Sequence, residues 1–338
     1  MTTRYETAHE STEGHSDTHP TALQLICEGG LECQLADKSI LITGASAGIG
    51  LETAKALFTS GATLYLTARD LEKARHALGE EMVNSPRVRL LQLDLADLDS
   101  VRACAITFLE LSETGKLNIF VANAGVMASP ETHTKDGFET HFGVNYLAHF
   151  LLFVLLRPSL LAAARASNSD SRAIFLTSIA HRYAELNLDD PNFEKTPHNK
   201  FAAYSASKTG LIWLSNEINR RYASQGLRSF AVEPGMMWTG LHRHLSEEEK
   251  SGIAADLGLK GRMRSTQQGA AAVVWAALSA GLEGEGGKYL EDCKVGELWD
   301  SREGMWAPGY AEHAFDKEKE RKLWDLSVEL VRFHEPEE

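Results

Sequence analysis

The stretch TGASAGIG, residues 43–50, follows the apolar segment SILI and precedes a segment with helical periodicity. Gly44, Gly48 and Gly50 lack a Cβ atom, so the backbone there can turn sharply and approach a phosphate group closely. The N-terminus of the following helix favours the negative charge of a pyrophosphate. The stretch therefore predicts a strand, a turn and a helix that bind a dinucleotide, although such glycines also occur in purely structural turns. The predicted contacts are Gly44, Ser46, Ala47, Gly48, Ile49 and Gly50.

Outward from this turn, short apolar runs alternate with amphipathic stretches. The expected strands are SILITG, ATLYLTA, RVRLLQLD, LNIFVANAG, RAIFLTS, LRSFAVEPG and GKYL. Strands that alternate with helices are typical of parallel sheets. We therefore predict an α/β fold with a single doubly wound parallel sheet of the Rossmann type and helices on both faces. Residues 38–338 form one catalytic domain, with a substrate flap near residues 236–265.

The first 37 residues differ in composition from the rest. They contain Arg4 and seven acidic residues, and polar and small residues dominate the first 20. We expect this N-terminal tail to be partly mobile. The apolar patch TALQLIC either docks on the body or stays outside it, and a chain that starts near Leu35 is expected to keep its melting temperature.

Composition excludes several classes of function. The net charge of −13, from 34 basic and 47 acidic residues, predicts no extended basic surface for nucleic acid. Four cysteines without a CxxC pair indicate free thiols and a reducing, cytoplasmic location. The 13 histidines suggest no dedicated metal site. The longest apolar run is broken by Arg157 and Pro158, so we expect no integral membrane segment.

Tyr204 and Lys208 are four residues apart in the predicted helix AAYSASKTGLIWLSNEINRRYA. Residues at this spacing share a helix face, which places an ammonium group beside a phenol. A free tyrosine has a pKa near ~10, and a nearby positive charge favours the phenolate. Lowering that pKa by ~3 units requires about 4 kcal/mol. We expect Tyr204 to act as a general acid or base on a carbonyl or alcohol.

The ordered motifs resemble those of the short-chain dehydrogenase/reductase family. These motifs are the G-x3-G-x-G turn, LDL, NAG, GVNYLAHF and YSASK, followed by PGMMWT, and the resemblance covers about residues 38 to 330. TARDLEKA, NAGVM, DDPNFEK and GGKYLEDC resemble its retinol-dehydrogenase-like group. The resemblance implies catalytic roles for Asn145, Ser178, Tyr204 and Lys208, with Asn145 organising a water chain. It implies cofactor contacts by Asp94, Leu95, Asn123, Ala124, Gly125, Tyr204, Lys208, Pro234, Gly235, Met236 and Thr239, and commonly a homodimer or homotetramer.

The choice of cofactor depends on the end of the second strand. An acidic residue there accepts hydrogen bonds from a ribose 2′-hydroxyl, whereas a cation favours a 2′-phosphate. Ala68 occupies the position that is acidic in NAD-dependent relatives, and Arg69 follows it. We therefore expect NADP. Asp70 complicates this choice, because it either pairs with Arg69 or caps the next helix.

The predicted flap mixes Met236, Met237, Trp238 and Leu241 with a charged SEEEK run. These apolar side chains either bind a bulky apolar substrate or pack the flap on the body. Glu233, just before Pro234, either forms a local salt bridge or places a carboxylate near the site. The function expected is an NADP-dependent oxidoreductase that interconverts a ketone or aldehyde and an alcohol, with a small molecule as its partner. The alternatives are a silent cofactor-binding scaffold and a carbon–carbon double-bond reductase, which the Tyr–Lys spacing disfavours.

Overall fold

The computed structural model describes residues 19–167, 169–260 and 262–334. Most of the stretch predicted to be mobile, residues 1–18, lies outside the described residues. Within the described part, eight strands form one sheet in the order β3-β2-β1-β4-β5-β6-β7-β8. The strands β1 to β7 pair in parallel, and β8 pairs antiparallel to β7. Their bounds are β1 Ser39–Ile42, β2 Thr63–Ala68, β3 Val88–Gln92, β4 Ile119–Ala122, β5 Ser171–Leu176, β6 Leu227–Glu233, β7 Lys288–Glu291 and β8 Lys294–Val295.

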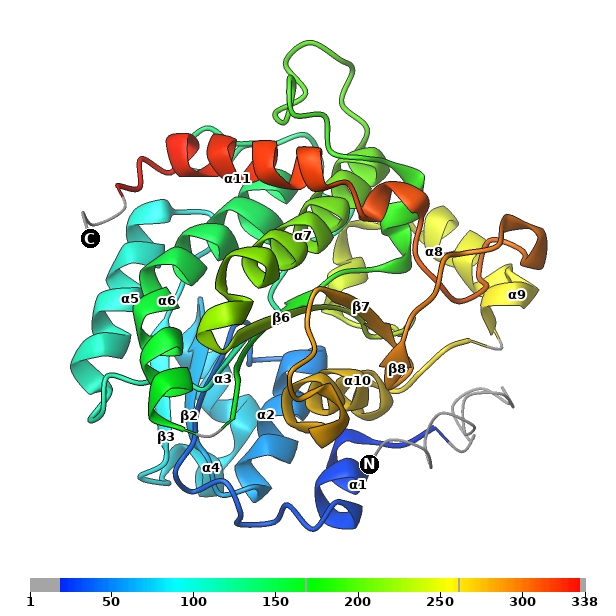
Figure 1. Cartoon of the computed structure of the whole chain (residues 1–338). Coiled ribbons are helices and arrows are strands. Elements are labelled where there is room, and N and C mark those ends of the chain that lie inside the picture. The colour runs from blue at the N-terminus through cyan, green and yellow to red at the C-terminus, as the bar shows by residue number, and fades with distance from the viewer. Residues whose placement is uncertain (1–18, 168, 261, 335–338) are drawn as a thin grey trace.

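Helices cover both faces of the sheet, which confirms the predicted doubly wound α/β fold (Figure 1). One face packs against α1, α2 and α10, and the other against α5, α6, α7 and α11. The helices are α1 Ala22–Glu28, α2 Gly48–Thr59, α3 Leu71–Leu78, α4 Glu80–Val83, α5 Leu98–Leu111, α6 Ala148–Ala166, α7 Lys200–Tyr222, α8 Glu247–Ala255, α9 Leu257–Lys260, α10 Thr266–Leu278 and α11 Lys317–Leu330.

Helix α1 forms from the apolar patch TALQLIC and docks on the body. Thr21 caps it, because its side chain accepts from the backbone N–H of Gln24 at 3.3 Å while the Gln24 side chain accepts from Thr21 N–H at 2.7 Å. Leu25 and Ile26 are fully buried in the core cluster that also contains residues of α2 and α10. The expectation that a chain starting near Leu35 keeps its melting temperature therefore conflicts with the structure, because such a chain lacks the part of the core that α1 supplies.

Helix α11 covers the opposite face, where it lies across α7 (Figure 1). Trp324 packs edge-on against Phe150 of α6, with 5.1 Å between the ring centroids. The hydroxyls of Tyr146 and Ser327 form a buried hydrogen bond of 2.7 Å. The C-terminal helix is thus an integral part of the core.

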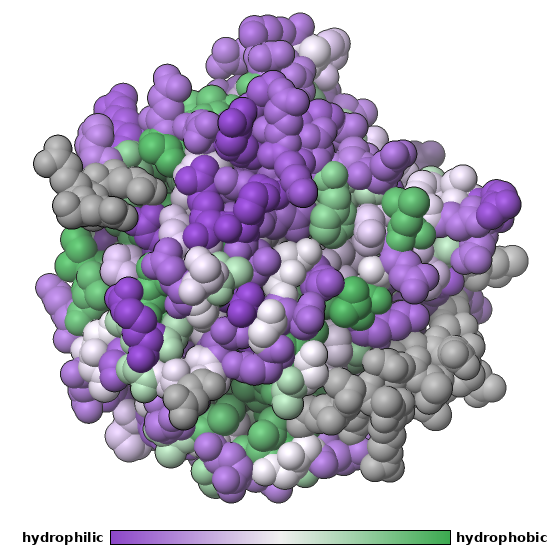
Figure 2. Space-filling view, viewed as in Figure 1, coloured by the Kyte–Doolittle hydropathy of each residue, from purple (hydrophilic) through white to green (hydrophobic). Residues whose placement is uncertain are grey.

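Among the described residues, one helical stretch, Phe142–Ala166, is long and apolar enough to cross a membrane, and most of it is buried inside the protein. Phe150, Leu151 and Leu152 are completely inaccessible to solvent. A helix that is buried in a protein core has the same apolar composition as a membrane-spanning helix. Packing inside the protein therefore accounts for the apolar composition of this stretch. On the face shown in Figure 2, hydrophilic side chains predominate and apolar ones occur in scattered groups.

Candidate active site

A cleft of about 1050 Å³ runs along the carboxyl edge of the parallel strands. Its walls come from the turn before α2, the segments that follow β4, β5 and β6, and the N-terminal half of α7. Ligands bind at this edge in open α/β sheets because the helix N-termini and the loops converge there. The cleft joins most of the residues that the sequence motifs predicted for the site.

The glycine turn forms one end of the cleft. Gly44 and Gly48 adopt positive φ angles of 71° and 57°, a conformation that favours glycine. The Thr43 hydroxyl accepts hydrogen bonds from the backbone N–H groups of Asn123 and Ala124 at 2.9 and 3.0 Å. These bonds join the turn to the segment after β4. The predicted residues that line the cleft from these two segments are Gly44, Ser46, Ala47, Gly48, Ile49, Asn123, Ala124 and Gly125.

Gly50 lies inside the turn and does not line the cleft, and its predicted contact with the cofactor stays a prediction. A Cβ atom there would lie 2.4 Å from both Asn123 Nδ2 and the Gly44 carbonyl oxygen. Asn123 itself donates from Nδ2 to the Thr43 carbonyl at 2.7 Å. Gly50 therefore permits the close packing that shapes the turn.

Two leucines line the cleft after β3, and the aspartate between them does not. Leu93 and the predicted Leu95 contribute to the wall, whereas Asp94 does not line it. The Asp94 carboxylate instead accepts from the Ala96 N–H at 3.0 Å. In the chain alone, Asp94 thus stabilises its own loop, and the adenine contact implied by the family resemblance stays a prediction.

At the end of β2 the cleft is bordered by Ala68, Arg69 and Lys73. Asp70 caps α3 by accepting from the Lys73 N–H at 3.0 Å. Among the described residues no ion pair joins Asp70 to Arg69, so capping is the correct alternative for Asp70. Arg69 is exposed at this rim. Lys73 was not predicted, because its position depends on the first turn of α3.

Tyr204, Ser178 and Lys208 lie together in the middle of the cleft. The Tyr204 side chain is 6% exposed and forms a hydrogen bond with the Ser178 hydroxyl. Lys208 Nζ lies 5.6 Å from the centre of the Tyr204 ring and donates to the Leu176 carbonyl at 2.8 Å. The helical spacing therefore places the ammonium beside the phenol, as predicted.

The expectation that Lys208 lowers the pKa of Tyr204 is wrong for the protein chain alone. Burial raises the pKa of Tyr204 to about 12, the Ser178 hydrogen bond opposes this shift, and the charge of Glu233 adds to it. Burial also lowers the pKa of Lys208 to about 7. Desolvation disfavours both charged forms, and it outweighs any attraction between ammonium and phenolate.

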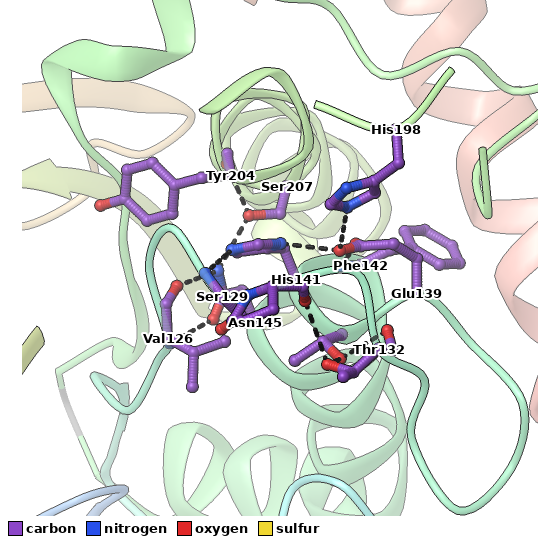
Figure 3. Close-up of polar contacts among 12 residues, drawn as sticks. Val126, Ser129, Thr132, Glu139, His141, Phe142, Asn145, His198, Tyr204 and Ser207 are labelled. Atoms are coloured by element: carbon purple, nitrogen blue, oxygen red, sulfur yellow. Dashed lines mark hydrogen bonds and ion pairs between the residues drawn. The ribbon is translucent and has the colours of Figure 1, made fainter. Parts of the chain in front are cut away.

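Asn145 lies behind the cleft wall, on a π-helical segment, Phe142–Leu147, that precedes α6 (Figure 3). Its side chain holds both backbone polar groups of Val126, with Nδ2 donating to the carbonyl at 3.0 Å and Oδ1 accepting from the N–H at 2.8 Å. Nδ2 also donates to Ser207 Oγ at 2.9 Å, and that hydroxyl donates to the Tyr204 carbonyl at 2.7 Å. Asn145 therefore links the loop after β4 to the helix that carries Tyr204.

Glu139, His141 and His198 form a buried group beside Tyr204 that the sequence did not predict (Figure 3). Glu139 Oε1 lies 2.7 Å from His141 Nδ1 and 3.2 Å from His198 Nε2. Burial favours a raised pKa for Glu139, but the hydrogen bonds that its carboxylate accepts, first of all the one from His141, outweigh this effect and lower the pKa. His141 Nε2 accepts from the Ser129 N–H at 3.2 Å, so Nδ1 carries the ring proton and has no lone pair for a metal. These contacts favour a hydrogen-bonded clamp.

The predicted flap contains a short 3₁₀ helix, Gly240–His244, followed by α8 and α9. Met236, Met237 and Leu241 line the cleft, together with the predicted Pro234, Gly235 and Thr239. Met237 is buried, and a Cβ atom on Gly269 of α10 would lie 2.3 Å from its Cε atom. Trp238 is 42% exposed and packs on His242. The flap residues thus divide between the cleft, the body and the surface.

Several cleft residues carry no sequence motif, and Trp306 is the most informative. It reaches the cleft from the C-terminal segment, and its Nε1 donates to Asp256 Oδ2 of the flap at 2.9 Å. Arg182 holds this segment by donating to the Met305 and Gly309 carbonyls. The other unpredicted lining residues include Tyr183, Phe201, Arg243 and Ile253.

A glycine turn at a helix N-terminus and a Ser–Tyr–Lys group in the same cleft of a doubly wound fold are typical of a nicotinamide-dependent oxidoreductase. The family model described as short chain dehydrogenase matches residues 38–250. The chain therefore belongs to the short-chain dehydrogenase/reductase family.

Three relatives illustrate the range of similarity. The chain is 41% identical over 333 residues to the short-chain dehydrogenase/reductase prx1 of Penicillium roqueforti, covering 98% of this chain and 96% of that protein. It is 37% identical over 305 residues to retinol dehydrogenase 12 of Mus musculus, covering 88% and 87%. A solved protein from Mycobacterium paratuberculosis, described as uncharacterized, superposes with a TM-score of 0.69 at 28% identity and covers 95% of this chain and all of its own.

Proposed function

We propose that the protein is an NADP-dependent oxidoreductase that interconverts a ketone or aldehyde and an alcohol on a bulky apolar substrate. The observation that carries the proposal is that Ser178, Tyr204 and Lys208 line one cleft, with Lys208 Nζ 5.6 Å from the centre of the Tyr204 ring, and that this cleft begins at the glycine turn. The bound nicotinamide supplies or accepts the hydride. The four free cysteines, Cys27, Cys33, Cys104 and Cys293, support a cytoplasmic location.

In the reductive direction, Tyr204 donates its phenolic proton to the carbonyl oxygen while the carbonyl carbon is reduced. A pKa of about 12 keeps the phenol protonated at neutral pH, which suits a proton donor. Ser178 holds the carbonyl oxygen at the same place. Lys208, with a pKa of about 7, can return a proton to the site at neutral pH.

Two features support NADP as the cofactor. Arg69 is exposed at the cleft rim after β2, and Lys73 lines the same rim, so a 2′-phosphate would meet two cations. Asp70 is engaged as the cap of α3. A charge-assisted hydrogen bond to phosphate is stronger than a neutral one, which favours NADP over NAD.

The lining beyond Tyr204 supports a bulky apolar substrate. Ile179, Met236, Leu241, Ile253 and Trp306 contribute apolar surface there. Burying such surface contributes about 25 cal/mol per Å², enough for several kcal/mol with a ring system. The name of the mouse relative, retinol dehydrogenase 12, is consistent with an apolar alcohol.

The test measures oxidation of NADPH and NADH against two panels, polycyclic or aromatic ketones and short hydroxy-ketones with sugars. We expect higher kcat/KM for the polycyclic panel with NADPH. Arg69→Ala should weaken NADPH binding about tenfold or more and leave NADH binding nearly unchanged. Higher values for the small polar panel would overturn the substrate assignment, and equal losses for both cofactors would overturn the role of Arg69.

A further inference from the structure

Glu233 ends strand β6 on the side of the sheet that faces α7. It pairs in register with Glu291 of β7, and Ala231, two residues earlier on the same face, packs with Ile212 of α7 and with Tyr289. Glu233 also lines the cleft in which Ser178 and Tyr204 lie, and its charge acts on Tyr204. A carboxyl group therefore lines the same cavity as Ser178 and Tyr204.

The charges of Arg182 and Arg264 act on Glu233, but both side chains contact other groups. Arg182 donates to the backbone carbonyls of Met305 and Gly309, and Arg264 lies 3.7 Å from Asp292. Across residues 19–167, 169–260 and 262–334, no lysine or arginine forms an ion pair with Glu233. One carboxyl oxygen of Glu233 accepts from the Gly235 N–H at 2.9 Å. The carboxyl group keeps acceptor capacity that a ligand in the cleft can use.

We propose that Glu233 is a specificity-determining residue that accepts a hydrogen bond from a hydroxyl group of the substrate, next to the reacting carbonyl. The substrate class is then an apolar hydroxy-ketone, with the corresponding diol as its reduced form. This inference rests on the function proposed above. It decides between the two alternatives left open for Glu233, in favour of a carboxyl group in the site.

The substrate needs a hydroxyl group opposite Glu233 because desolvating a carboxyl group without a new partner costs free energy. A bulky apolar substrate excludes water from the cleft, so Glu233 loses its solvent partners unless the substrate replaces them. A site with a buried acceptor rejects analogues that lack the matching donor, because the acceptor then has no partner. Among the described residues that line the cleft, Glu233 alone carries a carboxyl group, so this contact falls to Glu233.

The experiment compares two bicyclic ketones that differ by one hydroxyl, 2-hydroxy-1-tetralone and 1-tetralone. We expect the wild-type protein to prefer the hydroxy-ketone by about 10- to 100-fold in kcat/KM. Glu233→Leu should reduce this ratio to about one, and Glu233→Gln, which keeps an acceptor, should give an intermediate ratio. A purely structural role would lower both rates together and leave the ratio unchanged.

Glu291→Gln is the matched control, because Glu291 is the neighbouring carboxyl in the sheet and does not line the cleft. The ratio of kcat/KM for the hydroxy-ketone to kcat/KM for the plain ketone should be the same in this variant as in the wild-type protein. Calorimetric binding of both ketones to the wild-type protein and Glu233→Leu, with NADPH present, provides a readout that does not depend on turnover. A wild-type ratio near one in both assays overturns the inference, whereas preferential binding without turnover of either ketone overturns only the proposed reaction.

Discussion

The two ends of the cleft are built differently. The cofactor end is built around one short segment, the turn before α2, which backbone N–H groups of the segment after β4 hold in place through Thr43. The substrate end joins residues from distant parts of the chain, such as the flap residue Asp256 and Trp306. The first end depends on the conformation of a few adjacent residues, and the second depends on side-chain contacts across the fold. Substitutions in the turn at the cofactor end should therefore lower the stability of the fold. Substitutions at the substrate end should change which substrates the protein accepts.

The largest effect is expected where the two ends meet, at Tyr204. Tyr204→Phe removes the proton that we assign to the reacting oxygen and keeps the ring in its buried position. Turnover should fall by ~10² to 10⁴ while NADPH affinity stays nearly unchanged. Steady-state kinetics and fluorescence titration measure the two quantities. Full turnover by this variant would place the proton donor elsewhere.

Removal of residues 1–34, which include α1, should destabilise the cofactor end more than the substrate end. The truncation exposes surface on α2 and α10 that Leu25 and Ile26 cover. Burying two such side chains contributes roughly 3 to 6 kcal/mol before ordering terms, so the melting temperature should fall by several degrees. Thermal unfolding with and without NADPH tests this. An unchanged melting temperature would show that α1 contributes little to the fold.

A pair of glycine substitutions compares the two ends directly. Gly50→Ala places a Cβ atom 2.4 Å from Asn123 Nδ2 and from a backbone oxygen, whereas Gly252→Ala in α8 meets no atom within 4 Å. The first should destabilise the protein by about 1 to 3 kcal/mol. The second should be neutral or slightly stabilising, because alanine favours helix. Denaturant unfolding measures both, and similar losses would contradict the contrast.

Trp306→Leu should alter substrate choice and leave the cofactor end intact. The change removes an aromatic wall and the hydrogen bond to Asp256. We expect KM for flat polycyclic ketones to rise about tenfold, with a smaller change for short ketones and none in NADPH affinity. Trp306→Phe keeps an aromatic ring and should recover part of the loss. Equal KM changes for both substrate classes would show that Trp306 only supports the flap.

The smallest effect concerns the pH dependence of stability at Glu233. Burial, followed by the charge of Asp292, raises the pKa of Glu233 from 4.5 to about 7 in the folded protein. The folded state therefore holds this proton more tightly, so stability decreases as pH rises through this interval. Glu233→Gln should raise the melting temperature at pH 8, and the gain should disappear near pH 5. A difference that does not vary with pH would exclude this explanation.

Sequence reasoning predicted the parts of the molecule that depend on local chemistry. The G-x3-G-x-G turn requires positive φ at Gly44 and Gly48, and the spacing of Tyr204 and Lys208 puts both on one helix face. It failed where burial decides the outcome. The direction of the Tyr204 pKa shift depends on how much of the ring is desolvated, which residue spacing does not show. The docking of α1 likewise depends on an apolar surface that α2 and α10 form together.

The sequence by itself determined the α/β fold, the glycine turn before α2 and the placement of Tyr204 and Lys208 on one helix face, because each follows from backbone geometry or from periodicity over a few adjacent residues. Only the tertiary structure decided that Gly50 packs against Asn123 and that Glu233 faces the cleft without an ion pair. It alone brought Trp306 to the substrate end. These features depend on contacts between segments distant in sequence, and such contacts are set by the packing of the whole chain.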